Sequence, residues 1–176
     1  MMDDGLIKQV IEALLMSSSE PLSLDTMLAI FDEWEKPTRS QLQQVLDDLT
    51  RDYEPRSIEL KKLASGYCFQ TKQQYASWVA RLFVEKPVKY SNALFEILSI
   101  IAYRQPVTRA DMEEIRGVAV SVSILKTLLD REWIRVAGFR DVPGKPAVYI
   151  TTKAFLDYFN LVSLNDLPSL DTVNHE

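Results

Sequence analysis

The chain has 176 residues, 47% of them hydrophobic and 26% charged, which is the composition of an ordinary globular protein. Its 25 acidic residues outnumber its 20 basic ones, so the net charge is −5, and no basic run offers the phosphate-neutralising face of a dedicated DNA-binding protein. The single histidine, His175, lies beside the C-terminus, and the single cysteine, Cys68, cannot form an internal disulfide. These counts exclude His-activated nucleophiles, His-based metal sites and a disulfide framework.

The sequence contains neither a membrane-spanning segment nor a phosphate-binding loop. No apolar run approaches the roughly 20 residues of a membrane span, and the N-terminus is acidic rather than basic, so we expect no membrane contact and a cytoplasmic location. The nearest approach to a phosphate-binding loop is Gly138 to Lys145. Its glycine spacing is one residue too long, and Pro146 stands where a Mg²⁺-binding hydroxyl belongs. We therefore expect a hairpin turn there, no cofactor, and a protein that is not an enzyme.

The first half of the chain predicts three helices, a hairpin and a further helix. Apolar residues at helical spacing predict the first helix, and Ser23 and Thr38 are candidate N-caps of the next two helices. Residues with a period-two alternation on both sides of a Ser65-Gly66 turn predict a hairpin. The expected elements are Leu6 to Leu15, the helix after Ser23, the helix from Thr38 to just before Pro55, a hairpin from Ile58 to Thr71, and a helix from Gln73 to Phe83.

The second half repeats this order. Its expected elements are a helix from Leu94 to Ala102, a helix from Asp111 to Arg116 closed by Gly117, a helix striped by Val122 to Leu129, a hairpin of Trp133–Val136 and Val148–Thr151, and a closing helix from Lys153 to Asn160 capped by Thr151 or Thr152. Pro21-Leu22-Ser23 with Met27 and Ile30 matches Pro106-Val107-Thr108 with Met112 and Ile115 at identical spacing. Chance similarity of two turn signals is the alternative, but the shared proline, cap and two core positions favour a duplication.

Three helices followed by a two-stranded wing form the winged helix-turn-helix layout. The predicted fold is therefore mainly α with small β-hairpins, in two tandem winged domains. We expect a first domain over 1–84, a linker over 85–90, a second domain over 91–167, and a polar, disordered tail over 168–176.

Four stretches in order resemble the family of segregation and condensation protein B. They are Glu12–Leu15 with Glu20–Ser23, Ser65–Tyr67 leading to Tyr75, Val107–Val118, and Gly144–Thr152 with the Phe155-to-Pro168 segment. The resemblance runs from about Ile7 to Pro168. Lys145 replaces the family's usual Arg, and Asn160 replaces a helix-ending Gly.

The resemblance implies a non-catalytic accessory subunit of the bacterial SMC condensin complex, which condenses and segregates chromosomes during cell division. Such proteins form homodimers and bind the kleisin subunit, segregation and condensation protein A, which bridges the heads of the SMC ATPase. It also implies a cytoplasmic, nucleoid-associated protein. Composition and spacing alone indicate only a tandem winged helix without catalytic residues.

The candidate kleisin-binding residues lie in the second domain. They are Arg109, Glu113, Arg116, Phe139, Pro143 and Lys145. The three charged residues of the helix could equally form an ordinary solvated face with i,i+3 and i,i+4 pairs. The apolar residues of the wing tip either fold back on the domain or touch a partner.

The candidate dimer contacts lie in the first domain. They are Met27, Phe31 and Trp34, and Trp34 could instead cover the first core. A winged-helix transcription regulator and a carboxylate-dependent enzyme are the alternatives to the adaptor. The first domain's third helix argues against the regulator because Asp47, Asp48 and Asp52 would repel phosphate. We expect only weak or indirect association with DNA, because cations gather only around the second wing.

Overall fold

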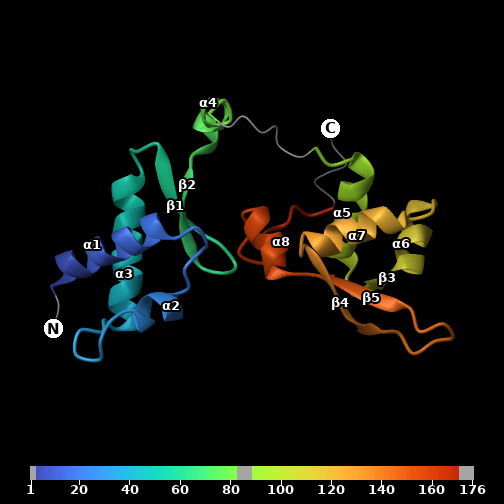
Figure 1. The fold of residues 1–176 in the computed structure, drawn as a ribbon, viewed down its shortest axis with the longest axis horizontal. Coiled ribbons are helices and arrows are strands. Elements are labelled where there is room, and N and C mark those ends of the chain that lie inside the picture. The colour runs from blue at the N-terminus through green and yellow to red at the C-terminus, as the bar shows by residue number, and fades with distance from the viewer. Residues whose placement is uncertain (1–2, 83–88, 171–176) are drawn as a thin grey trace. The chain divides into compact units, whose positions relative to one another are not determined.

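The computed structural model describes residues 3–82 and 89–170, which belong to two compact units that divide at Lys86 and Pro87 (Figure 1). Each unit has its own buried apolar cluster, so each is described by itself. Most of the predicted linker and residues 171–176 of the predicted tail lie outside the described residues.

The first unit holds three helices, a hairpin and a short helical segment. These elements are α1 (Asp4–Ser17), α2 (Leu24–Ala29), α3 (Arg39–Tyr53), β1 (Ile58–Lys62), β2 (Tyr67–Thr71), the 3-10 turn η1 (Gln73–Tyr75) and α4 (Ala76–Val79). The caps act as predicted. The Ser23 side chain accepts from the Thr26 N–H, and Thr38 forms a reciprocal capping box with Gln41. The apolar stripes of α1 and α3 then meet in one core with Met27 of α2 and with Leu60 and Tyr67 of the hairpin.

The second unit repeats the arrangement with one strand more. Its elements are α5 (Asn92–Arg104), β3 (Val107–Thr108), α6 (Arg109–Arg116), α7 (Val122–Asp130), β4 (Ile134–Phe139), β5 (Ala147–Thr151), α8 (Lys153–Tyr158) and the 3-10 turn η2 (Leu164–Asp166). Thr108 and Asp111 form the predicted capping box, Gly117 ends α6 in the left-handed region at φ 71°, and Thr152 rather than Thr151 caps α8. Asn160 also has a positive φ of 57°, as expected of the residue that replaces a helix-ending Gly.

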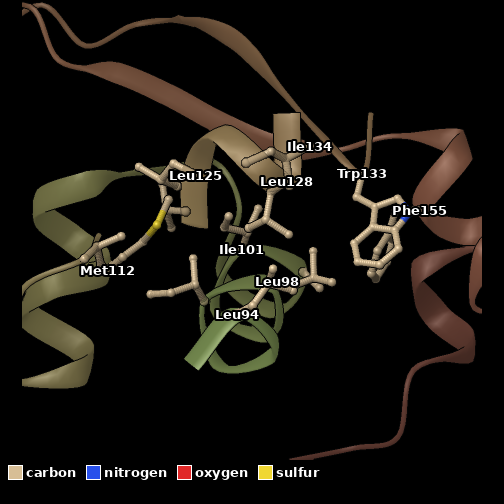
Figure 2. Close-up of a cluster of buried hydrophobic side chains, with 13 residues drawn as sticks. Leu94, Leu98, Ile101, Met112, Leu125, Leu128, Trp133, Ile134 and Phe155 are labelled. Carbon is tan, nitrogen blue, oxygen red and sulfur yellow. The ribbon is translucent and has the colours of Figure 1, made fainter. Parts of the chain in front are cut away.

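Side chains from four helices and the wing fill the second core. Figure 2 shows Leu94, Leu98 and Ile101 of α5 directed towards Leu125 and Leu128 of α7, with Met112 closing one end and Trp133 with Phe155 the other. Trp133, which we expected to begin the wing, is 3% exposed and lies just before β4. Its ring centroid lies 4.5 Å from that of Tyr158 and 5.2 Å from that of Tyr90, both in tilted contacts, so it joins the wing's base to α8.

The duplicated proline motif has the same structural role in both units. Val107 and Thr108 pair antiparallel with Tyr149 and Val148 of β5, which makes a three-stranded sheet of order β3-β5-β4. In the first unit, the matching Leu22 forms an isolated antiparallel bridge with Tyr67 of β2. The sequence did not indicate this pairing, because two residues are too few to show an alternating pattern. The shared pairing supports a duplication of one winged unit.

Three boundaries differ from the prediction. The segment expected as a helix from Gln73 to Phe83 has a 3-10 turn and an α-helix that ends at Val79, and Phe83 lies outside the described residues. Tyr90, expected in the linker, packs against Trp133 and beneath the Arg131 guanidinium. Pro168, expected in the tail, accepts a 2.6 Å hydrogen bond from the Tyr103 hydroxyl. The second unit therefore extends beyond 91–167 on both sides.

Over the two described ranges, no helix has both the length and the apolar character that crossing a bilayer requires.

Candidate partner-binding surfaces

A charged clasp fixes the second wing to the start of α6. The Arg140 guanidinium donates to both carboxylate oxygens of Asp111, at 2.9 and 2.6 Å. The same carboxylate accepts from the Thr108 N–H at 2.8 Å, because Asp111 is the third residue of α6 and belongs to its capping box. The Arg140 hydrogen bonds, assisted by the Thr108 N–H, lower the pKa of Asp111 to about 2.

Glu113 stabilises the turn of the helix-turn-helix. Its Oε1 accepts from Arg109 Nε at 2.9 Å and from the Val120 backbone N–H at 2.9 Å. These two donors, the Val120 amide first, lower the pKa of Glu113. The predicted i,i+4 pair with Arg109 is present, but the carboxylate also holds the segment between α6 and α7. Glu113 therefore acts within the domain, and a direct role in partner binding stays a prediction.

Arg116 lies at the other end of α6 and turns towards α5. Its Nε and Nη2 donate to Glu96 Oε2 at 3.0 and 2.8 Å, and its side chain is only 17% exposed. It borders an open hollow of about 710 Å³ with Phe95, Ile100 and Val118. The eight residues of α6 span only about 12 Å, yet Arg116 is tied to α5 and Asp111 is tied to the wing. The candidate Arg116 therefore lies at the end of α6 that is tied to α5, away from the end that is tied to the wing.

The wing tip carries the exposed apolar candidates. Phe139, the last residue of β4, is 69% exposed, Val142 is 44% exposed, and Pro143 and Lys145 are also exposed. The Phe139 ring is thus mostly in solvent rather than folded back into the core, and the β4–β5 hairpin projects beyond the helices of its unit (Figure 1). Lys145 adopts a positive φ of 38°, which places it in the tight turn before β5.

The three candidate dimer contacts have different surroundings. Met27 is 0% exposed and packs in the first core, so its predicted place in a surface contact is wrong. The repeated motif had also predicted Met27 as a core position, and that prediction is confirmed, because Met27 belongs to the buried cluster with residues of α1 and α3. Phe31 is partly buried against the same core, and Trp34 is 90% exposed, so Trp34 does not cover the core. Beside them, Ile30 is 59% exposed.

Elsewhere in the described ranges, no group of three or more His, Cys, Asp and Glu side chains is arranged to hold a metal ion. On the first unit's third helix, Asp48 is paired with Arg51, and Asp52 with Lys8 at 2.6 Å. Sequence reasoning missed Glu96 and Arg140 as ionic partners, because each lies 20 or more residues from the side chain that it binds. It also left out the exposed Trp78 and Leu82, although their spacing with Tyr75 was visible in the sequence.

The Asp111–Arg140 clasp gives a stability prediction with a defined pH dependence. We expect Asp111→Asn to destabilise the second unit by about 1–2 kcal/mol at pH 7, because it removes the charge that Arg140 binds and weakens the cap. That range is discounted for solvent, since the two side chains are 28% and 43% exposed. The folded-state pKa is depressed, so the carboxylate's contribution is complete above about pH 4 and is lost as pH falls through about 2.

Urea unfolding followed by the emission of buried Trp133 measures this effect. The difference in the free energy of unfolding between the wild type and Asp111→Asn should become smaller as the pH falls towards 2. Asp141→Asn, an exposed change in the neighbouring wing loop, is the matched control and should stay within about 0.5 kcal/mol. If the difference in the free energy of unfolding were the same at pH 7 and at pH 2, the ionised Asp111 carboxylate would not be the source of the stabilisation.

Two winged-helix units, a wing held by an ionic clasp and exposed apolar side chains define a small tandem winged-helix protein equipped for contact with other macromolecules. The sequence pattern of the family described as "Segregation and condensation complex subunit ScpB" matches residues 9–170. The chain belongs to this family of chromosome segregation and condensation proteins.

Two relatives of known sequence agree with this assignment. The chain is 51% identical over 166 residues to the segregation and condensation protein B homolog of Coxiella burnetii. This alignment covers 94% of this chain and 79% of that protein. It is 42% identical over 171 residues to segregation and condensation protein B of Syntrophotalea carbinolica, covering 96% and 84%. A solved structure described as a dimer of the ScpB N-terminal domain complexed with ScpA peptide is 27% identical, with a TM-score of 0.40, and covers 45% of this chain and 96% of that chain.

Proposed function

We propose that the chain is a non-catalytic adaptor that forms a homodimer and binds the kleisin subunit of a bacterial SMC condensin complex. Through the kleisin it reaches the SMC ATPase and acts in chromosome condensation and segregation, in the cytoplasm at the nucleoid. The observation that carries this proposal is the family match over residues 9–170, which spans both winged units.

The surface chemistry supports protein contact over DNA contact. A DNA-reading winged helix presents basic side chains from its third helix, but Arg39 and Arg51 of α3 are both paired with aspartates, and Asp47 is exposed beside them. On the second wing, Arg140 is already bound by Asp111, which reduces the positive charge available to phosphate. Exposed aromatic side chains, in contrast, are typical anchors of protein interfaces, and Trp34, Trp78 and Phe139 are all more than half exposed.

We further propose a division of labour between the units. The first winged domain forms the dimer, with Phe31 and Trp34 among its contacts, since a homodimer interface needs apolar surface to bury. The second domain binds the kleisin through α6 and the wing, with Phe139 and Pro143 as apolar anchors and Arg109, Glu113, Arg116 and Lys145 around them.

A pull-down from bacterial lysate with the tagged full chain tests the adaptor role. We expect it to bring down a kleisin and an SMC ATPase, both identified by mass spectrometry. Sedimentation equilibrium of the purified chain should show a dimer at tens of micromolar, a concentration that corresponds to roughly 6 kcal/mol of association energy. Recovery of one sequence-selective DNA fragment without a kleisin would support the regulator instead.

A further inference from the structure

An apolar segment at the end of the first unit is not covered by the other described residues of that unit. We name Gln73–Leu82, which contains η1, α4 and the turn after α4, the arm. Nine of its ten residues are exposed and only Ala76 is partly covered. Four of the exposed side chains are large and apolar: Tyr75 is 37% exposed, Trp78 64%, Val79 37% and Leu82 79%.

The four apolar residues have the spacing of one helical stripe, although only Trp78 and Val79 lie in α4 itself. Their spacing of three, four and seven residues places them on the same side of a helix, and the Tyr75 and Trp78 rings lie 6.5 Å apart. The close neighbour of α4 is η1, which belongs to the same arm. Figure 1 shows α4 beyond the end of β2, away from α1 and α2. So short a helix is not stable alone in water, and most helical stability comes from packing an apolar face. The arm therefore has the properties of a docking element.

Charge indicates what the arm docks on. Arg81 is the only charged residue of the arm. Residues 3–72 of the same unit contain thirteen Asp and Glu against eight Lys and Arg, a net charge of −5. Two arms that paired with each other would bring like charges together, whereas an arm placed on the body of a first unit would bring opposite charges together. The arm's charge thus complements the acidic surface of its own kind of unit.

We propose that the arm of one copy docks on residues 3–72 of a second copy, and that the two copies exchange arms reciprocally. Such an exchange obeys the two-fold symmetry usual for homodimers, in which each contact occurs twice. Trp78 and Leu82 are the apolar anchors of the contact, and Arg81 supplies its electrostatic attraction. This inference rests on the homodimer proposed above and adds the arm to the first-unit contacts that form it.

Sedimentation equilibrium of the full chain tests the proposal with single variants of the arm. Trp78→Ser and Leu82→Ser should each raise the dimer dissociation constant at least about tenfold, as expected for a truncated aromatic or aliphatic anchor. Arg81→Glu should also weaken the dimer and reduce its salt dependence. Leu170→Ser is the matched control, because Leu170 is 48% exposed but lies in the second unit, and it should leave the constant unchanged.

Circular dichroism should show all four variants folded, since exposed substitutions seldom unfold a domain. Arm variants that dimerise as tightly as the wild type would overturn the exchange while leaving the adaptor role intact. Arm variants that keep the dimer but lose kleisin affinity would also overturn it, because the arm would then belong to the kleisin contact. A wild-type chain that is monomeric at tens of micromolar would overturn both the exchange and the proposed homodimer.

Discussion

Gly66→Ala is expected to destabilise the first winged unit by about 3–4 kcal/mol. Gly66 has a φ of +151°, and a Cβ added there would lie 2.2 Å from the Leu22 carbonyl oxygen and 2.6 Å from the Ser23 nitrogen. Both atoms are backbone, so neither can rotate away. Relief requires moving the strand pairing in which Leu22 and Tyr67 exchange hydrogen bonds of 2.9 and 2.8 Å. A clash with a fixed backbone and the loss of that pairing together explain the size of the effect.

Thermal unfolding followed by circular dichroism measures the loss. At about 4–8 °C per kcal/mol for a domain of this size, the first unit's transition should fall by more than about 12 °C, while the second unit's stays in place. Gly144→Ala is the matched control. Gly144 also has a positive φ, of +86°, but a Cβ there meets nothing within 4 Å. It should therefore cost only the backbone strain of about 1–2 kcal/mol. Equal losses from the two substitutions would show that the approach to Leu22 is not what requires glycine.

Local rules were enough to predict the order of the main helices and of the two hairpins, although not strand β3. The caps Ser23, Thr38 and Thr108 act on neighbours three residues away, and Gly117 ends α6 by its own backbone conformation. Such interactions depend only on nearby residues, so spacing in the sequence reveals them. The duplicated motif then extended the predicted order of elements to both halves of the chain, but its second predicted core position is wrong, because Ile30 is 59% and Ile115 is 54% exposed.

Features that depend on tertiary packing could not be predicted this way. The Arg140–Asp111 and Arg116–Glu96 pairs join residues 29 and 20 positions apart, and no spacing rule relates them. Met27 and Trp34 are both large and lie seven residues apart, yet one is 0% and the other 90% exposed. Their place in the folded unit decides which of them is covered, since Met27 joins the buried cluster and Trp34 does not. For this reason the candidate surfaces needed the structure, whereas the fold class did not.

The ionic pairs also change what each candidate residue is expected to contribute. Arg116 and Glu113 already have partners inside their own unit, so replacing either one disturbs the fold as well as any contact. Phe139 stands at the end of β4 with 69% of its surface exposed, so replacing it removes apolar surface with little disturbance to the core. The wing tip is therefore the place where binding can be tested separately from stability.

Phe139→Ala is expected to weaken kleisin binding by about 1–3 kcal/mol, the range for a truncated interface anchor. A partner segment commonly binds as an amphipathic helix that buries its apolar face in a groove, where a few aromatic side chains supply most of the energy. Calorimetry with a kleisin fragment and the full chain measures the effect. Arg116→Ala should cost less, because a charged residue at the edge of a contact changes mainly the association rate and its salt dependence.

Trp34→Ala is the matched control for the choice of unit, because Trp34 is an even more exposed aromatic residue of the first unit. If the second unit binds the kleisin, this variant keeps wild-type affinity at protein concentrations well above its dimer dissociation constant, where a weakened dimer does not limit binding. Loss of affinity in Trp34→Ala with none in Phe139→Ala and Arg116→Ala would move the kleisin site to the first unit. The adaptor role would survive that outcome, since it requires only that the chain bind a kleisin, but α6 and the wing would then need another partner to explain the exposed Phe139.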